Sequence, residues 1–385
     1  MRRSSERIIT THVGSLPRPH DLLDMMKARS ERQPVDEEAF DQRVESAVGE
    51  AVQRQVECGV DVVSDGEQGK DSFYAYAAGR LSGFEPRDAG PTASRPWPRE
   101  INAFPEFYRD YYFGRRSKGR IGADMTLVCT GPVTYQGHFE VQKDIARLKA
   151  AAQAAGALEA FMPATVPQGL GRNEYYRNDE EYAQAIAEAM REEYRAIVEA
   201  GLVLQVDDPY LTSFFADEAS PEEQRRRAEA YVEILNHALR GIPPDMIRFH
   251  TCYGINEGPR VYDPPLSLFV ELMLRINAGA YSFEAGNPQH DHEYHLFEDV
   301  KLPAGKAIIP GVISHTTNVV EHPEVVAERI IRYAERAGPE NVIAGSDCGF
   351  SSQATYTPDV HPTVVWAKFR SLSQGAELAS KRLWR

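Results

Sequence analysis

The chain has 385 residues, of which 42% are hydrophobic and 26% are charged, and its net charge is −14 at pH 7. This length and composition suffice to bury a large core, either as one large barrel or as two ordinary domains. The acidic balance argues against a nucleic-acid partner, because phosphate binding requires basic patches. No run of about 18 apolar residues occurs, so no membrane-spanning helix is expected. The amino-terminal segment lacks the apolar centre of a signal peptide, and four cysteines do not form a disulfide framework in a chain of this length, so a cytoplasmic protein is expected.

Short strand-like runs alternate with helical patterns along the chain, which is typical of an α/β fold with parallel strands. The clearest helical pattern covers residues 179–200, which begin with acidic residues and end at Gly201. A second helix is predicted over 321–338, which ends at Gly338. The strand-like runs are residues 8–15, 61–66, 202–209, 246–252, 280–286, 307–314 and 341–347.

Two further segments, residues 123–135 and 157–169, compete for the place of one remaining strand. A closed barrel needs eight strands, and counting both segments gives nine. We favour 157–169, because it directly precedes the helix over 179–200. The chain is therefore predicted to be one (β/α)8 barrel over residues 1–385 with an insertion over residues 86–150. The insertion is rich in proline, arginine and aromatic residues, which predicts a lid or a contact between subunits of a homo-oligomer.

Four potential metal ligands lie at or just after the ends of predicted strands: His250, Cys252, Glu284 and Cys348. In a parallel barrel such ends converge on one face, where active sites are built. Side chains at positions i and i+2 of a strand face the same way, so His250 and Cys252 can reach one ion. Cysteine at a strand end is more commonly a packing residue, but the set of four predicts a zinc site. Two thiolates, one imidazole and one carboxylate are suitable zinc donors.

The charge of this donor set indicates which chemistry it suits. Three negative ligands exceed the two positive charges of zinc, so the ion would activate water poorly, whereas it can hold a substrate thiol as a thiolate for attack on carbon. His315 also follows a strand, and it can protonate a leaving group or, alternatively, cap a helix. The histidines of the run QHDHEYH, His290, His292 and His295, are interpreted as a pocket rim or a solvated helix face.

Two carboxylates and a serine complete the predicted site. Glu67 and Asp207 lie at strand ends and can together bind the ammonium group of an amino-acid substrate, although acids in such positions also commonly cap the following helix. Ser15 follows the first strand and can bind a carboxylate or a sulfonate, with Arg18 adding positive charge. The alternative for Ser15 is a tight turn set by its glycine and proline neighbours.

The chain resembles the catalytic barrel of the cobalamin-independent methionine synthases through ordered motifs, HVGSLPRP, SDGEQGK, LQVDDP, HTCY, SFEAG, GVISHTTNV and GSDCGF. The resemblance covers most of the chain outside residues 86–150. It implies a (β/α)8 barrel of the methionine synthase and uroporphyrinogen decarboxylase type. The residue roles that it implies are zinc ligation by His250, Cys252, Glu284 and Cys348, homocysteine binding by Ser15, Glu67 and Asp207, and acid catalysis by His315.

The sequence also departs from that family. Full-length enzymes carry an additional amino-terminal half that this sequence does not include, and residues 86–150 have no counterpart. The leading hypothesis is zinc-dependent methyl transfer to a thiol, homocysteine, which yields methionine. The alternatives are an epoxyalkane:coenzyme M transferase, in which a thiolate opens an epoxide, and a binding or decarboxylase-like barrel with structural zinc. The expected partners are a small-molecule thiol and a methyl or alkyl donor that the sequence does not specify.

Overall fold

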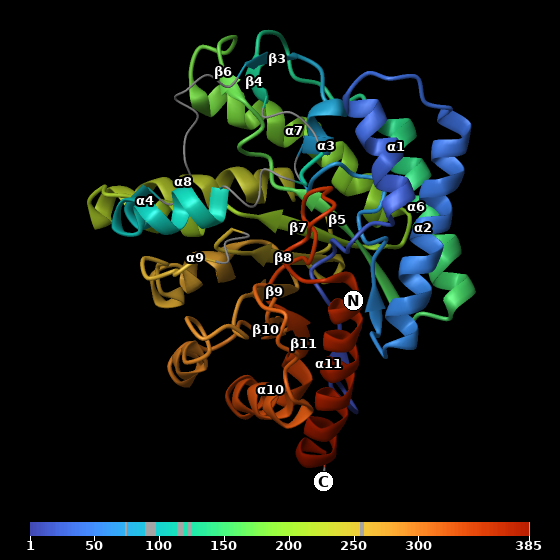
Figure 1. The fold of residues 1–385 in the computed structure, drawn as a ribbon. Helices are drawn as coiled ribbons and strands as arrows, with labels where there is room; N and C mark the ends of the chain where they lie inside the picture. Colours follow the sequence, from blue (N-terminus) through green and yellow to red (C-terminus); the bar gives the residue numbers. More distant parts are fainter. Residues whose placement is uncertain (74, 89–97, 114–118, 122–124, 255–257, 385) are drawn as a thin grey trace.

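The computed structural model describes residues 1–73, 75–88, 98–113, 119–121, 125–254 and 258–384. Eight parallel strands pair in the order β1-β11-β10-β9-β8-β7-β5-β2, and a parallel bridge between Thr11 and Val62 joins the two ends of this sheet. The predicted (β/α)8 barrel is confirmed (Figure 1). The barrel strands are β1 (Ile9–Thr10), β2 (Val62–Val63), β5 (Glu159–Thr165), β7 (Val203–Asp208), β8 (Ile247–Thr251), β9 (Ala280–Phe283), β10 (Ala307–Ile313) and β11 (Ile343–Ser346).

The two segments that compete for the last barrel strand belong to different sheets. Residues 157–169 contain β5, which pairs with β2 and β7 inside the barrel, so this preference is confirmed. Residues 123–135 contain β4 (Met125–Cys129), which pairs with β3 (Phe84–Asp88) and β6 (Arg172–Asn173) in a separate three-stranded sheet. Six of the seven residues of β5 are buried, as expected for a strand that is covered on both faces.

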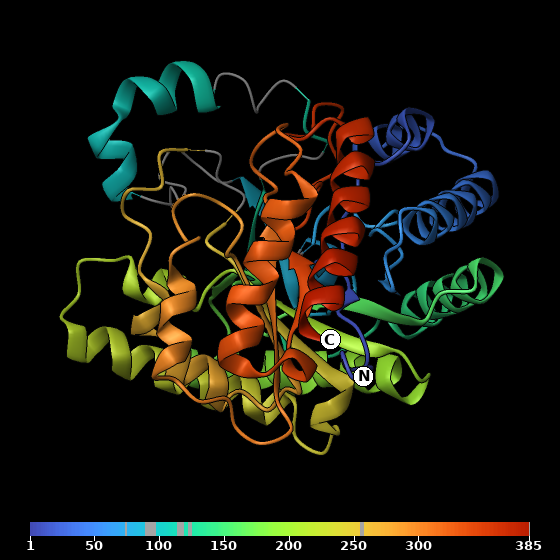
Figure 2. The same cartoon turned by 90° about the horizontal axis from the view of Figure 1, so that it is seen from below.

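Helices surround the barrel (Figures 1 and 2). The predicted helix over 179–200 is α7, which is capped at its start by Asn178 and followed by Gly201 with a φ of +84°. The described helices include none that is both long and apolar enough to cross a bilayer. The helices are α1 (His20–Ser30), α2 (Glu37–Glu57), α3 (Ala75–Gly79), α4 (Pro98–Ala103), α6 (His138–Ala155), α7 (Asp179–Glu199), α8 (Pro221–Ala238), α9 (Val270–Arg275), α10 (Pro323–Ala337) and α11 (Pro362–Leu383), with shorter turns η2 (Thr212–Phe215), η3 (Pro244–Met246), η4 (Leu266–Leu268), η5 (Glu293–Glu298) and η6 (Pro339–Asn341).

The segment predicted as an insertion, residues 86–150, contains elements of two kinds. Its first part holds most of β3, the helix α4 and the π-helical segment η1 (Phe107–Phe113), and Figure 2 shows α4 and η1 standing out from the rest of the molecule. Its last part belongs to α6, which packs against α2 and α7 in the helical ring and leads into β5. The boundary at 150 therefore falls inside a helix of the ring around the barrel, because α6 begins at His138.

The barrel interior combines an apolar layer with a buried cation. Arg248 of β8 is 2% exposed, and its guanidinium donates hydrogen bonds to Thr11 Oγ1 (2.8 Å) and to the carbonyl of His12 (2.6 Å). It lies 4.0 Å from the ring centre of Phe161. Because alternate side chains of a strand share a face, His250 follows Arg248 inside the barrel toward the carboxyl end of β8. The apolar layer consists of Ile9, Val62, Phe161, Val203, Ala280, Ala307, Ile309 and Ile343.

Candidate metal and substrate site

The polar residues predicted from the strand ends gather at the carboxyl end of the barrel. One cavity there, with a volume of about 70 Å³, receives side chains from the ends of β1, β2, β7, β8 and β11. Two predicted site residues, Glu284 and His315, belong to a second buried group beside it. The cavity is lined by Val13, Ser15, Glu67, Phe73, Asp207, Asp208, Pro209, His250, Cys252, Gly254, Cys348 and Ser352.

Three of the predicted metal ligands converge in this cavity. The ligand atoms of His250, Cys252 and Cys348 all lie within 4.8 Å of one another, and all three residues are buried. His250 Nδ1 lies 3.0 Å from Ser282 Oγ, whereas its Nε2 has no hydrogen-bond partner among the described residues. Burial, with the nearby Arg248 guanidinium, lowers the pKa of His250 to about 3, which keeps the ring neutral. A neutral imidazole that is oriented through one nitrogen and bare at the other has the form of a metal ligand.

The two thiols also fit a metal ion. Contact with Cys252, followed by burial, raises the pKa of Cys348 well above its ordinary value. Two adjacent buried thiols resist ionisation because a second negative charge has no cation to offset it, and a divalent metal supplies that charge. Two sulfur donors and one imidazole are typical of zinc. The residues present therefore fit a zinc ion at this position.

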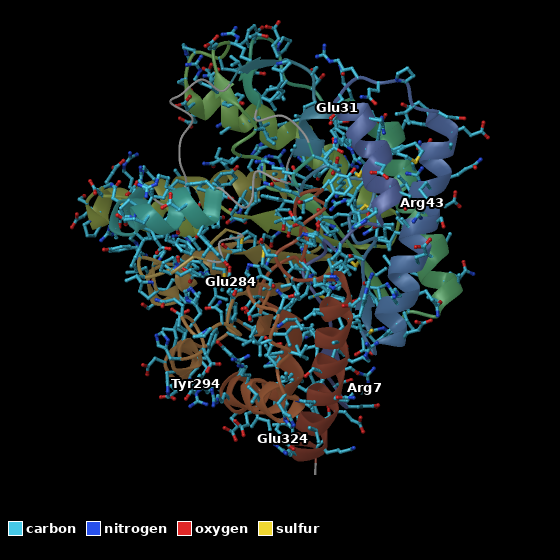
Figure 3. The ribbon with its side chains drawn as sticks, in the orientation of Figure 1. Arg7, Glu31, Arg43, Glu284, Tyr294 and Glu324 are labelled. Atoms are coloured by element: carbon cyan, nitrogen blue, oxygen red, sulfur yellow. The ribbon has the colours of Figure 1, made fainter. Side chains whose placement is uncertain are left out.

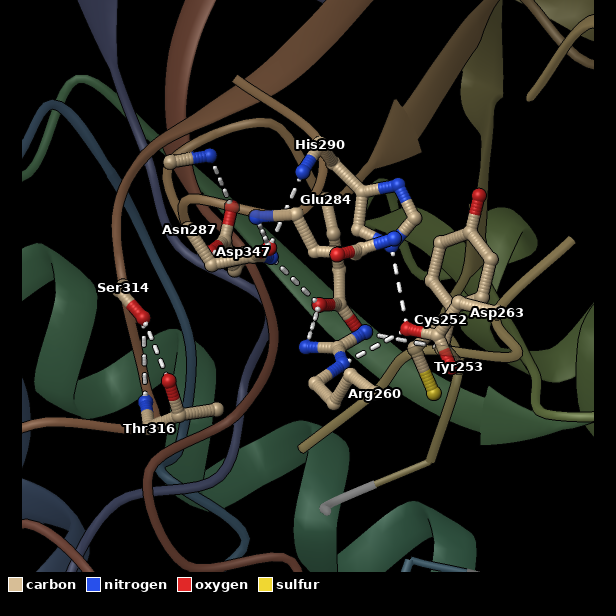
Figure 4. A network of polar contacts seen from close by, with 12 residues as sticks. Cys252, Tyr253, Arg260, Asp263, Glu284, Asn287, His290, Ser314, Thr316 and Asp347 are labelled. Carbon is tan, nitrogen blue, oxygen red and sulfur yellow. Dashed lines mark hydrogen bonds and ion pairs between the residues drawn. The ribbon is translucent and has the colours of Figure 1, made fainter. Parts of the chain in front are cut away.

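Glu284, the fourth predicted ligand, is held by protein donors. It is 1% exposed, and Figure 3 labels it near the middle of the molecule in that view. Its Oε1 accepts a hydrogen bond from the backbone N–H of Tyr253 (3.1 Å). Its Oε2 accepts from Arg260 Nη1 (2.7 Å) and from Asn287 Nδ2 (3.0 Å), as Figure 4 shows. Because Tyr253 directly follows Cys252, the carboxylate of Glu284 lies close to the predicted ligands. It is not one of the three residues whose ligand atoms converge.

A second buried group adjoins the first. Glu284, His315 and Asp347 offer ligand atoms that lie within 4.8 Å of one another. Asp347 accepts hydrogen bonds from the two backbone N–H groups that follow Glu284, at 2.8 and 2.6 Å, and thereby holds the turn after β9. Asp347 was not among the predicted site residues, although an acid at the end of a strand, directly before Cys348, is a usable signal.

Glu67 and Asp207 form a pair of buried carboxyl groups. Burial raises the pKa of Glu67 to about 7, against the opposing charges of Lys70 and Arg18. Its Oε2 has no hydrogen-bond partner among the described residues. Burial and then the charge of Glu67 raise the pKa of Asp207 well above its ordinary value. Two such carboxyl groups in one cavity favour a cationic ligand, because a cation stabilises both in the charged form.

Ser15 and Arg18 have different surroundings. Ser15 Oγ faces the cavity and lies 3.3 Å from Ser352 Oγ. Arg18, which was expected to add charge beside Ser15, is buried, and it donates hydrogen bonds to the carbonyl oxygens of Ser351 (2.9 Å) and Lys70 (2.6 Å). The two terminal nitrogens of the guanidinium therefore tie the loops after β1, β2 and β11 together through backbone carbonyl oxygens.

His290 differs from the sequence-based interpretation. It is 1% exposed, and its ring stacks on that of Tyr253 with 4.1 Å between the ring centres. Burial lowers the pKa of His290, but its contacts with Asp263 (3.2 Å) and Glu293 (2.9 Å) outweigh burial and raise the pKa to about 9. A buried ring between two acids does not lie on a solvated helix face, so that interpretation was wrong for His290. The two later histidines of the run are exposed, as expected.

A wider hollow of about 560 Å³ lies elsewhere, between α1, α2, α3 and α6. Several of its cations are paired with neighbouring acids: Arg80 contacts Asp144, and Arg147 lies 3.0 Å from Asp41. Charges that already neutralise one another offer little to a ligand, so the smaller cavity at the strand ends is the better functional candidate.

Known proteins resemble this chain over nearly its whole length. It is 24% identical over 384 residues to the methionine synthase of Thermococcus kodakarensis, which covers 98% of this chain and 94% of the relative. It is 23% identical over 344 residues to the methionine synthase of Sulfolobus acidocaldarius, which covers 88% and 85% respectively.

Two solved structures share the fold. A B12-independent methionine synthase from Shewanella sp. W3-18-1 in complex with selenomethionine superposes with a TM-score of 0.72 at 21% identity, over 98% of this chain and 99% of the other. A putative B12-independent methionine synthase from Listeria monocytogenes gives 0.66 at 20% identity, over 96% and 98%. The family model of the cobalamin-independent synthase catalytic domain matches residues 8–165 and 163–360. These matches span more than half of the chain, and the protein therefore belongs to the family of cobalamin-independent synthase catalytic domains.

Proposed function

We propose that the protein is a zinc-dependent methyltransferase that converts homocysteine to methionine. The observation that carries this proposal is that one cavity holds both a sulfur-rich ligand group and a buried carboxyl pair. A small molecule with a thiol at one end and an ammonium group at the other complements both. The relatives named methionine synthases support homocysteine as that molecule.

The residues around the cavity have distinct roles in this proposal. His250, Cys252 and Cys348 hold zinc, which would keep the substrate sulfur as a nucleophilic thiolate. Glu67 and Asp207 bind the ammonium group, which turns two costly buried carboxylates into an ion-paired group. The backbone and hydroxyl of Ser15 bind the substrate carboxylate at the end of β1.

His315 acts on the other reactant. The sulfur lone pair forms the new sulfur–carbon bond, and the bond from the methyl carbon to its donor breaks, with its electron pair leaving on the donor. His315 supplies a proton to that leaving group, and its position beside Glu284 and Asp347 orients it. The added segment that contains α4 acts as a lid that limits access of water to the reactive sulfur, or as a contact between subunits.

The test is zinc-edge X-ray absorption of the purified protein, alone and with homocysteine or coenzyme M. We expect two sulfur neighbours at rest and a third with homocysteine only. In the Glu67→Gln variant, the third sulfur should require a higher homocysteine concentration, because the ammonium loses a charged partner. A third sulfur with coenzyme M only would instead indicate the epoxide-opening transferase. No added sulfur with either thiol would contradict the proposal, as would a protein without bound zinc.

A further inference from the structure

Arg260 occupies an unusual position beside the proposed metal. It lies on the loop after β8 and is 5% exposed. Its Nη1 donates to Glu284 Oε2 at 2.7 Å and its Nε donates to Asp263 Oδ2 at 2.7 Å. Its Nη2 is buried with no hydrogen-bond partner among the described residues. One guanidinium is thus shared between two acids, one of which is Glu284, the fourth predicted ligand (Figure 4).

A carboxylate cannot use the same oxygen fully for a metal ion and for a guanidinium. Oε2 of Glu284 accepts from both Arg260 and the amide of Asn287, whereas Oε1 accepts, among the described residues, only from the backbone N–H of Tyr253. Zinc that recruits Glu284 must therefore compete with Arg260 for its negative charge. A charge-assisted bond between a guanidinium and a carboxylate is among the stronger protein hydrogen bonds, so this competition is substantial.

Helix α4 holds Arg260 in place. Glu100 of α4 accepts a hydrogen bond from the backbone N–H of Arg260 at 2.7 Å and from the hydroxyl of Tyr108 at 2.8 Å. Arg260 has a φ of +58°, a left-handed conformation that is unfavourable for a residue with a side chain. The bond to Glu100 stabilises this conformation, and so α4 is connected to the metal site through a single loop residue.

We propose that Arg260 is a positioning residue that draws Glu284 away from the metal and thereby leaves one coordination position to the thiol substrate. This inference rests on the proposed zinc-dependent function. In this arrangement Glu284 stays paired with Arg260, and a metal held by His250, Cys252 and Cys348 would keep one position for the thiolate. Arg260 would thereby neutralise the negative charge of Glu284, which the metal would otherwise offset.

The test is the zinc dissociation constant, measured by competition with a chromophoric chelator. In the Arg260→Met variant we expect zinc to bind about tenfold more tightly or better, because Glu284 loses its competing cation. X-ray absorption should show an additional oxygen neighbour, and the third sulfur should require more homocysteine. The Asp263→Asn variant should bind zinc more weakly than the wild type, because Arg260 then pairs with Glu284 alone. Glu100→Ala should also bind zinc more tightly than the wild type, but by a smaller factor than Arg260→Met.

The control is Arg275→Met, which removes a surface arginine that lies 3.3 Å from Glu229 and 3.2 Å from Glu233. Its zinc affinity should equal that of the wild type. If Arg260 only supports the loop, Arg260→Met will bind zinc equally or more weakly, and this result overturns the proposal. If Arg260→Met does not fold, Asp263→Asn decides, and unchanged or tighter zinc binding in that variant is the overturning result. If the zinc of the wild type gains no sulfur neighbour when homocysteine is added, the proposed function is contradicted. The order of zinc affinities among the variants still tests the role of Arg260.

Discussion

Glu67 should lower the stability of the native protein at neutral pH, and the Glu67→Gln variant measures that cost. Burial raises the pKa of this carboxyl group from 4.5 to about 7 in the folded protein. The folded state therefore holds its proton more tightly than the unfolded state, and stability falls as pH rises from about 4.5 to about 7. Each pH unit in that window corresponds to about 1.4 kcal/mol, so the full cost is about 3 kcal/mol.

Glutamine keeps the size and shape of Glu67 but does not ionise. We expect Glu67→Gln to be more stable than the wild type by about 1 kcal/mol at pH 5 and by about 3 kcal/mol at pH 8. The assay is urea unfolding of both proteins at several pH values between 5 and 8, followed by circular dichroism. Comparing the two proteins at each pH cancels the titration of other groups that both share.

The matched control is Glu45→Gln, which alters an exposed glutamate of α2. Its stability difference from the wild type should stay constant across the same pH range. A constant difference for Glu67→Gln as well would refute the reasoning, because it would mean that Glu67 is not forced to ionise in a buried place. A stability difference that grows with pH would show that the ionised Glu67 carboxylate lowers the stability of the folded protein, as expected for a ligand-binding acid.

Three further changes have defined outcomes. Cys348→Ala removes one of three converging ligands, so zinc affinity should fall by about a hundredfold or more, and stoichiometric zinc by elemental analysis after dialysis would contradict the site. Glu193→Ala should lower the free energy of unfolding by about 3 kcal/mol, because it leaves buried Arg80 (3.1 Å away) without one of its acids; urea unfolding measures this, and a loss below about 1 kcal/mol would count against it. Asn178→Ala removes the side-chain acceptor for the backbone N–H of Glu181 (2.8 Å), and thermal unfolding should show a loss of about 1 kcal/mol, with an unchanged midpoint as the contrary result.

Local patterns determined the architecture of this protein. Alternating strand-like and helical runs predicted the parallel barrel, and the helix over 179–200 was visible from its spacing and its terminal Gly201. Strand ends of a parallel barrel meet on one face, so residues as distant in sequence as Ser15 and Cys348 were expected in one site, and the structure places both on the same cavity. These expectations depend on hydrophobic periodicity, which can be read from the sequence. They also depend on the rule that the carboxyl ends of parallel barrel strands share one face.

The pairing of side chains inside the site was decided only by the tertiary structure. Glu284 pairs with Arg260. The backbone of Arg260 adopts a left-handed conformation, and a hydrogen bond to Glu100 of α4 holds it there. His290 is buried between Asp263, Glu293 and the ring of Tyr253, and residues 138–150 belong to α6, which packs in the helical ring. Loop conformations have no periodicity, and the partners of a buried charge come from segments far apart in the chain. A sequence therefore indicates which groups reach the strand ends, while only the folded loops decide which of those groups neutralise one another.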